Sequence, residues 1–221
     1  MLLYIARHAQ SLGNAGEEKG PDPELTGHGL ECSRRLGERL AITKFDAIIA
    51  SPLLRAMQTA YEVVIRQPDG SLMLEPLHDL METGIPPEYQ GLGSDELIKK
   101  FPRMTRFPGE RTPADGPLCL GEEDASAVMS RAYRVMRYLR ARFPGDEDKV
   151  LLVTHATFMT RLISAALGLT HPQGFSFSHD NAGLTLIKIK PERIKLAFSN
   201  DTTHLYDENG EIDSMRYYPR I

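Results

Sequence analysis

The sequence predicts an α/β fold: a three-layer αβα sandwich, with helices flanking a mostly parallel sheet and a proline-rich lid inserted at about 83–121. Short apolar runs of strand length alternate with longer segments of helical spacing, which is typical of such sheets. The first run is apolar throughout, as in strands that helices cover on both faces. At 221 residues, the chain is expected to form a single domain, 1–221, that includes the lid.

The first part of the chain is expected to contain three strands, at 2–6, 46–50 and 71–77, the last at a sheet edge. Residues 9–25 are rich in turn-forming types and predict a loop. The Thr26 hydroxyl can cap a helix that ends near Ile42. Its expected apolar face carries Leu30, Leu36 and Leu40. Ser51 and Pro52 indicate the start of a second helix, because proline at the first helical position loses no hydrogen bond.

The middle of the chain is interrupted by prolines, at Pro86, Pro87, Pro102, Pro108, Pro113 and Pro117. Only a short helix near 95–101 is expected within this stretch. A long segment with little regular structure is usually functional. Residues 83–121 are therefore interpreted as a lid over a site.

The last part of the chain returns to the alternating pattern. A helix is expected at 122–143, with Val128, Tyr133, Met136 and Leu139 on one side. A strand at 150–154 and a helix at 158–167 should follow, and Gly168 suits the end of that helix. Two further strands, at 184–189 and 194–199, predict a hairpin. The polar tail after Tyr206 is expected to fray.

Composition excludes several classes of protein. The formal net charge of −4 argues against a nucleic-acid binder that works by bulk electrostatics. No apolar run approaches the ~20 residues of a membrane span, and two cysteines are too few for a disulfide framework. The first strand begins at residue 2, so no targeting segment is expected before it. The cytoplasm is the default location.

Two histidines stand at the ends of two apolar runs. Arg7 and His8 close the first expected strand, and His155 follows the strand at 150–154. Open α/β sheets bind their ligands at the carboxyl ends of the strands. An imidazole can attack phosphorus if its other nitrogen is held by an acceptor, commonly a backbone carbonyl. Taken singly, an Arg-His pair is more simply a strand-end histidine bonded to the backbone, and His155 a core histidine.

Arg55 and Glu82 add a cation and an acid. Arg55 lies in the first turn of the helix that Ser51 begins, where free N–H groups already favour anions. Glu82 follows the third strand, with Met81 and Ile85 nearby; a desolvated carboxyl could keep its proton and act as a general acid. A surface ion pair for Arg55 and a solvated loop carboxylate for Glu82 are the simpler alternatives.

The ordered motifs resemble the histidine phosphatases, the phosphoglycerate mutase-like superfamily. The resemblance runs from residue 1 to about 206. It rests on Arg7-His8 with Ser11 and Asn14, Leu25-Thr26, Ser51-Pro52-Leu53-Leu54-Arg55-Ala56-Met57-Gln58-Thr59-Ala60, Leu80-Met81-Glu82, Val153-Thr154-His155-Ala156, and Asn181 with Asn200-Asp201-Thr202-Thr203-His204. Two positions depart from the family pattern: Ala9 and Ala156 replace the glycines that usually follow each histidine.

The resemblance implies a role for each residue. His8 would be the nucleophile, and Arg7, Arg55 and His155 would hold the phosphoryl oxygens. Glu82 would protonate the leaving group and then activate water. Contacts with phosphate or substrate are expected from Ser11, Asn14, Thr26 and Ala156. The implied partner is a small phosphorylated substrate; no metal and no other cofactor is expected, and a homodimer is left open.

Within the resemblance, a phosphomonoester hydrolase that forms phosphohistidine is favoured over a mutase. Mutases of the family carry Glu-Arg-x-Tyr-Gly at the acid motif, whereas Thr83 and Gly84 follow Glu82 here. Two alternatives stay open. One is a 2,3-bisphosphoglycerate-dependent phosphoglycerate mutase that uses the basic residues of the lid, and the other is a phospho-ligand binder without turnover. Ala9 and Ala156 are the reason to keep the second.

Overall fold

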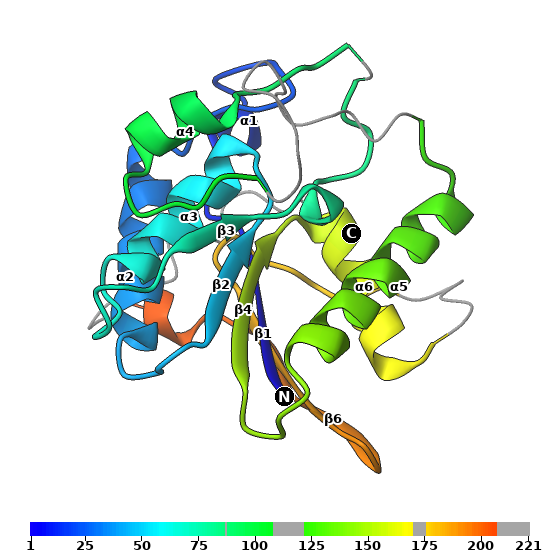
Figure 1. Ribbon diagram of the computed structural model, residues 1–221. Coiled ribbons are helices and arrows are strands. Elements are labelled where there is room, and N and C mark those ends of the chain that lie inside the picture. Colours follow the sequence, from blue (N-terminus) through cyan, green and yellow to red (C-terminus); the bar gives the residue numbers. More distant parts are fainter. Residues whose placement is uncertain (87, 108–121, 170–175, 207–221) are drawn as a thin grey trace.

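The computed structural model describes residues 1–86, 88–107, 122–169 and 176–206. Six strands of this part form one sheet in the order β3-β2-β4-β1-β5-β6 (Figure 1). The strands are β1 (Leu2–Arg7), β2 (Ala47–Ala50), β3 (Leu74–Pro76), β4 (Lys149–Thr154), β5 (Leu184–Lys190) and β6 (Arg193–Asp201). Strands β1 to β4 are parallel to one another. Strand β5 pairs antiparallel with β1, and β6 pairs antiparallel with β5. The sheet is therefore mixed, and its parallel part agrees with the mostly parallel sheet that was predicted.

Helices cover both faces of this sheet, as predicted. They are α1 (Leu12–Ala15), α2 (Gly27–Leu40), α3 (Leu54–Val64), α4 (Ser94–Lys100), α5 (Ala125–Arg142) and α6 (Ala156–Leu167), with short 3₁₀ turns η1 (His78–Leu80) and η2 (Thr203–Leu205). Figure 1 shows α2 and α3 on one face and α5 and α6 on the other. The three-layer α/β prediction is confirmed.

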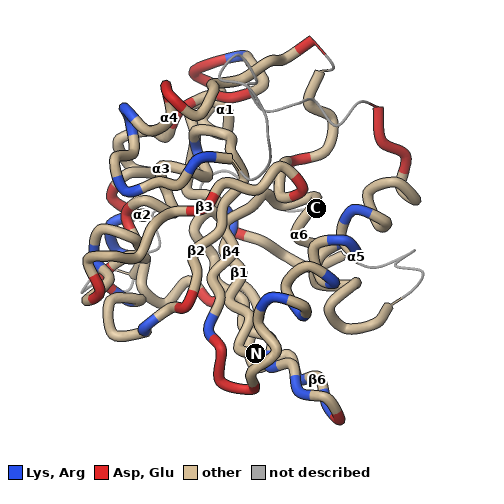
Figure 2. The backbone as a smooth tube through the Cα atoms, viewed as in Figure 1, with Lys and Arg blue, Asp and Glu red and all other residues tan. Residues whose placement is uncertain are grey.

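Alternating residues of the central strands explain the three layers. Ile48 of β2 belongs to the core formed with α2 and α3, whereas its neighbour Ile49 belongs to the core formed with α5 and α6. Successive side chains of a strand point to opposite faces, so a continuous apolar run serves two cores at once. Figure 2 shows the matching distribution of charge, which lies mainly on helices and loops and hardly on the central strands.

Several local predictions were wrong at helix surfaces and ends. Leu30 was expected on an apolar face but is 44% exposed, and Tyr133 is 38% exposed. The expected loop at 9–25 contains the one-turn helix α1, closed by a capping box between Ser11 and Asn14. Helix α3 begins at Leu54 after Leu53, so Ser51 does not cap it.

The lid prediction is tested only in part. Helix α4 lies where a short helix was expected, and Pro86 and Pro102 fall in described segments without strands. Pro87, Pro108, Pro113 and Pro117 lie outside the described residues, as does the tail after Tyr206. Closure of this segment over a site stays a prediction.

The parallel strands place four loops at one edge of the sheet. In the register, Ala50 of β2 pairs with Val153 of β4, and Val153 pairs with Ala6 of β1. The backbone N–H of Ser51 donates to Val153, and that of His8 donates to Thr154. The residues that follow β1, β2 and β4 therefore lie side by side, and η1 follows β3 at the same edge, opposite the chain start marked N in Figure 1.

Candidate active site

His8 is a buried residue directly after β1, and its ring orientation is fixed by a backbone contact. Its Nδ1 atom lies 2.7 Å from the carbonyl oxygen of Ala9. A carbonyl only accepts, so Nδ1 carries the hydrogen and Nε2 keeps its lone pair. Burial, and then the positive charges of Arg55 and Arg7, hold the pKa of His8 well below its ordinary value. The neutral imidazole that a nucleophile requires is thus the favoured form near neutral pH.

His155, the residue between β4 and α6, lies beside His8. The two ring centroids are 5.1 Å apart. The Nε2 atom of His155 is 2.7 Å from the hydroxyl of Ser51. That hydroxyl oxygen also accepts a long bond from the Leu53 N–H, so its hydrogen is available to Nε2. If the hydroxyl donates to Nε2, the ring proton is on Nδ1, which is buried without a hydrogen-bond partner among the described residues.

Burial also determines the charge of His155. Burial and the charge of Arg55 hold the pKa of its imidazole well below the ordinary value. In this tautomer the neutral ring presents an N–H donor at Nδ1 beside the ring of His8. Such a pre-positioned donor suits a developing negative charge on an oxygen of a ligand.

Two buried arginines stand next to the histidines. Arg7, the last residue of β1, donates from Nη1 to the carbonyl of His179 at 2.7 Å. Arg55, in the first turn of α3, donates to the carbonyl of Pro21 at 3.1 Å. Both positive charges act on the pKa of His8 and of His155, so the four side chains share one region. Guanidinium groups of this kind bind tetrahedral oxyanions through paired N–H donors.

Asp22 is a site residue that the sequence did not reveal. Its carboxylate accepts the Leu54 N–H at 2.7 Å, the Tyr89 hydroxyl at 2.7 Å and Arg55 at 3.4 Å. Asp22 therefore accepts a free N–H group at the start of α3, the role that was expected of the Ser51 hydroxyl. Burial raises the pKa of Asp22 to about 6, although Tyr89 and Arg55 oppose this. An acidic residue in a loop gives no sequence signal for such contacts, which join three distant segments.

Glu82 lies just after η1 and contacts the start of α6. One oxygen accepts the N–H groups of Thr83 at 2.9 Å and of Phe158 at 3.0 Å, and the other accepts that of Thr157 at 3.1 Å. Glu82 is half-buried, and its carboxyl group is surrounded by these N–H donors. The expectation of an apolar, desolvating environment was therefore wrong. Its negative charge acts on the pKa of Arg55, so Glu82 faces the cationic part of the site.

The expected substrate-contacting residues have structural partners of their own. Ser11 caps α1, and Thr26 caps α2 while donating to the side chain of Gln10 at 2.9 Å. The Asn14 side-chain oxygen accepts from Asn181 at 3.1 Å, and Asn181 also donates to the carbonyl of His8 at 3.0 Å. Asn14 is thus linked to His8 through Asn181. Their contacts with substrate stay predictions.

The two alanines that replace family glycines fit the fold. Neither Ala9 nor Ala156 adopts a positive φ angle, so neither position requires glycine. The Ala9 methyl packs in a small buried cluster with Leu25, Cys32, Ala182 and Leu205. Its N–H donates to the Thr59 hydroxyl at 3.0 Å. Ala156 is the first residue of α6, beside the carboxylate of Glu82.

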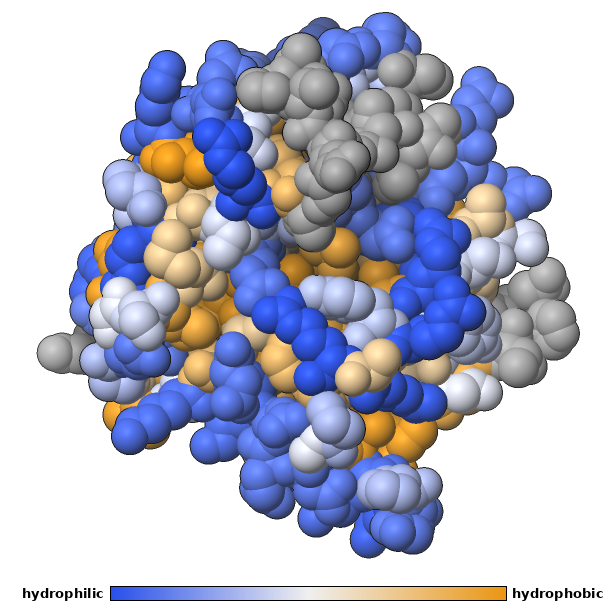
Figure 3. Space-filling view, viewed as in Figure 1, coloured by the Kyte–Doolittle hydropathy of each residue, from blue (hydrophilic) through white to orange (hydrophobic). Residues whose placement is uncertain are grey.

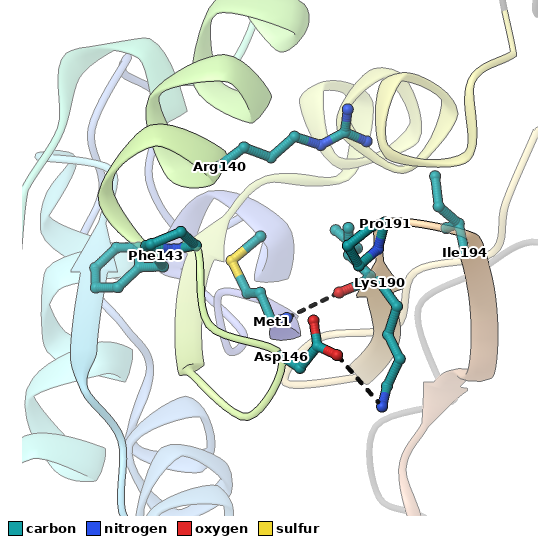
Figure 4. A pocket seen from close by; sticks show the side chains of 9 residues that line it. Met1, Arg140, Phe143, Asp146, Lys190, Pro191 and Ile194 are labelled. Atoms are coloured by element: carbon teal, nitrogen blue, oxygen red, sulfur yellow. Dashed lines mark hydrogen bonds and ion pairs between the residues drawn. The ribbon is translucent and has the colours of Figure 1, made fainter.

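A separate pocket of about 320 Å³ lies at the opposite edge of the sheet (Figure 4). It is lined by Met1, Phe143 and the turn after β5, and Lys190 and Asp146 form an ion pair of 3.7 Å at its rim. None of the site residues lines it. The face seen in Figure 3 is mainly hydrophilic, with hydrophobic surface in smaller areas between.

The described residues contain neither a cluster of metal-ligating side chains nor a membrane-spanning helix. In the segments that the structure describes, no three His, Cys, Asp or Glu side chains are grouped as ligands for a metal ion. No helix among the same residues combines the length and the apolar character that crossing a bilayer requires.

The buried histidines predict acid-sensitive stability. Burial lowers the pKa of His179 and of His204 to about 4, against an ordinary 6.5. Below pH 6.5 the unfolded chain binds protons that the folded protein excludes, so the free energy of unfolding should fall by ~1.4 kcal/mol per pH unit for each such histidine. Asp22, whose pKa is raised to about 6, offsets one of them below pH 6. Urea unfolding at pH 7.5, 6.0 and 5.0 checks this; constant or rising stability on acidification would contradict it.

Comparison with known proteins gives a family match over nearly the whole chain. A model described as "Histidine phosphatase superfamily (branch 1)" matches residues 3–202. Phosphoserine phosphatase 1 of Hydrogenobacter thermophilus is 27% identical over 206 residues, which cover 92% of this chain and 93% of that protein.

Solved structures agree in fold. A mycobacterial glucosyl-3-phosphoglycerate phosphatase with VO3 has a TM-score of 0.64 and 24% identity, covering 90% of this chain and 98% of its own. An Entamoeba histolytica phosphoserine phosphatase mutant with phosphoserine has a TM-score of 0.61 and 19% identity, covering 92% and 98%. At these identities the likeness is one of fold.

Proposed function

The chain belongs to the histidine phosphatase superfamily, and we propose that this phosphatase hydrolyses phosphomonoesters without a metal, through phosphohistidine at His8. It acts on small phosphorylated metabolites, as its family and relatives indicate. The observation that carries the mechanism is the pair of buried rings of His8 and His155, 5.1 Å apart. The Nδ1 hydrogen of His8 is held by a carbonyl, which leaves Nε2 for attack on phosphorus.

The first step transfers the phosphoryl group to His8. Nε2 forms a bond to phosphorus as the bond from phosphorus to the ester oxygen breaks. Protonated Glu82 gives its proton to that oxygen, so an alcohol leaves. Arg7, Arg55 and the Nδ1–H of His155 bind the other phosphoryl oxygens and stabilise the added charge in the transition state.

The second step returns the enzyme. The Glu82 carboxylate, now deprotonated, removes a proton from water, and the water oxygen forms a bond to phosphorus. The bond from phosphorus to Nε2 breaks and its electrons return to His8. Inorganic phosphate leaves, and Glu82 again carries its proton. One water is consumed for each ester hydrolysed.

The basic residues near the expected lid support hydrolysis over mutase chemistry. Lys100 pairs with Glu24 at 3.0 Å, and Arg106 pairs with Asp95 at 2.6 Å. Arg103 donates to the carbonyls of Asp69 and Leu72. Arg111 lies outside the described residues, and Lys99 is exposed on α4. Lys100, Arg103 and Arg106 thus each bind a partner within the chain, which supports a site that holds one phosphate.

A panel of phosphomonoesters tests the proposal. In the presence of a chelator, the protein should release inorganic phosphate from at least one of phosphoserine, 3-phosphoglycerate, glycerol phosphate and p-nitrophenyl phosphate. Phosphoserine and 3-phosphoglycerate are included because related phosphatases carry these compounds in their names or complexes. Adding 2,3-bisphosphoglycerate with 3-phosphoglycerate should not produce 2-phosphoglycerate. Isomerisation would instead establish the mutase, and binding without release would favour the non-catalytic binder.

The remaining parts of the proposal concern location and assembly. We propose a cytoplasmic location, and the net charge of −4 favours the absence of a nucleic-acid partner. A homodimer stays a prediction, which sedimentation equilibrium at micromolar concentration can test.

A further inference from the structure

Arg131, in the middle of α5, is an unusual core residue. It heads the group of large side chains with no exposed surface, at 0%. Charged residues are almost never fully buried unless they are paired. Its partner is Glu123, just before α5, which it contacts at 2.8 Å from Nε and 2.6 Å from Nη2. This bidentate pair fixes the guanidinium plane and leaves Nη1 for other acceptors.

The Nη1 atom donates to two carbonyls of the turn that carries Glu82. These are the carbonyl of Asp79 at 2.9 Å and that of Met81 at 2.7 Å. The carbonyl between them, that of Leu80, accepts the hydroxyl of Thr154 at 2.6 Å. The buried side chains of Arg131 and Thr154 thus hold the three consecutive carbonyls before Glu82. Thr154 is the residue next to His155 in the chain.

Arg131 also contacts the helix that orients the Glu82 carboxyl group. Its guanidinium carbon lies 4.0 Å from the ring centroid of Phe158, a stacked cation–π arrangement. The N–H of the same Phe158 donates to Glu82. One guanidinium therefore contacts both the turn before Glu82 and a residue that binds its carboxyl group.

We propose that Arg131 is a positioning residue for Glu82, setting the carboxyl group at the distance from the leaving oxygen that proton transfer requires. The inference rests on the proposed role of Glu82 as the acid. A proton donor acts within hydrogen-bond distance, and a displacement of about 1 Å at a reacting group can cost ~10²-fold in rate. Loosening the turn should therefore reduce acid catalysis more than it reduces phosphate binding.

The test compares two leaving groups. An alkyl phosphate needs protonation of its departing oxygen, whereas p-nitrophenyl phosphate releases a stable anion and needs it far less. In Arg131→Met, kcat/KM for the best alkyl phosphate should fall ~10²-fold, and for p-nitrophenyl phosphate less than ~10-fold. The informative quantity is the ratio of kcat/KM for the alkyl phosphate to kcat/KM for p-nitrophenyl phosphate. Combining Arg131→Met with Glu82→Gln should lower this ratio no further than Glu82→Gln alone.

Controls separate positioning from general damage to the fold. Arg134→Met removes an arginine one turn away that donates to the Asp79 carboxylate, and should leave the ratio unchanged. Arg131→Met leaves the partly buried Glu123 without its Arg131 partner, so Arg131→Met/Glu123→Met, which removes both charges, is measured beside it. Glu123→Gln weakens the contact with Arg131 and should lower the alkyl to nitrophenyl ratio by less than Arg131→Met does.

The outcomes have distinct meanings. If Glu82→Gln lowers the alkyl to nitrophenyl ratio and the Arg131 variants lower both substrates equally, the positioning role is overturned while the proposed function stands. If Glu82→Gln leaves the ratio unchanged, the acid role itself is overturned. If each substitution lowers kcat/KM for alkyl phosphates and the double variant loses no more than Glu82→Gln alone, the result supports both the acid role of Glu82 and the positioning role of Arg131.

Discussion

Replacing His8 by alanine should reduce kcat for phosphate release by on the order of 10⁴-fold or more, because no other described group can take its place as nucleophile. The imidazole is buried beside His155, and its Nδ1 hydrogen is fixed by the Ala9 carbonyl. Alanine removes the attacking atom and keeps both arginines. Substrate should therefore still bind, while turnover is lost.

A matched histidine and a trapping experiment make this result specific. His204 contacts Arg39 of α2 and is not one of the paired rings, so His204→Ala should keep most of the activity. Wild-type protein mixed with a ³²P-labelled ester and quenched in alkali should retain label, since phosphohistidine survives alkali and is lost in acid. Label on His8→Ala protein, or unchanged turnover by it, would overturn the assignment of His8 as nucleophile.

The positions that sequence reasoning located are the ends of strands. His8, Ser51 and His155 each follow an apolar run, and parallel strands in one sheet bring such ends to one edge. Apolar runs indicate where a strand is, and turn-forming residues indicate where it stops. Neighbouring positions after β1, β2 and β4 could therefore be expected from the chain alone.

The residues that sequence reasoning missed depend on contacts between distant segments. Asp22 belongs to the site because it binds Leu54 and Tyr89, which lie 32 and 67 residues away in the sequence. Arg131 has the helical spacing of a core position with Val128 and Val135, yet a charged residue is normally assigned to the surface. Only the position of Glu123 and of the turn carbonyls shows that its charge is satisfied inside.

Local rules also failed where one side chain had two candidate partners. Ser51 has the residue type of a helix cap, but its hydroxyl lies 2.7 Å from His155, while the carboxylate of Asp22 accepts the Leu54 N–H at the start of α3. Propensity names the kinds of partner that a hydroxyl prefers. Tertiary packing decides which partner is near.

Replacing Glu82 by glutamine should lower kcat/KM for alkyl phosphates by ~10²- to 10⁴-fold, the usual contribution of general acid catalysis. The amide keeps nearly the same shape, and its single oxygen can accept the N–H bonds that one carboxylate oxygen now receives from Thr83 and Phe158; the bond from Thr157 to the other oxygen is lost. It cannot donate a proton to the leaving oxygen. Since kcat/KM covers only the steps through phosphoryl transfer to His8, it isolates the acid role from the later activation of water.

The leaving group distinguishes this loss from a loss of binding. For p-nitrophenyl phosphate the same substitution should lower kcat/KM less than ~10-fold, because the departing anion is stable without a proton. Hydrolysis of phosphohistidine still requires the base, so kcat should fall for both substrates and labelled enzyme should accumulate. Glu88→Gln, at an exposed residue of the same segment, is the matched control and should change neither quantity. An equal fall in kcat/KM for both esters would mean that Glu82 holds the phosphate site together and does not transfer the proton.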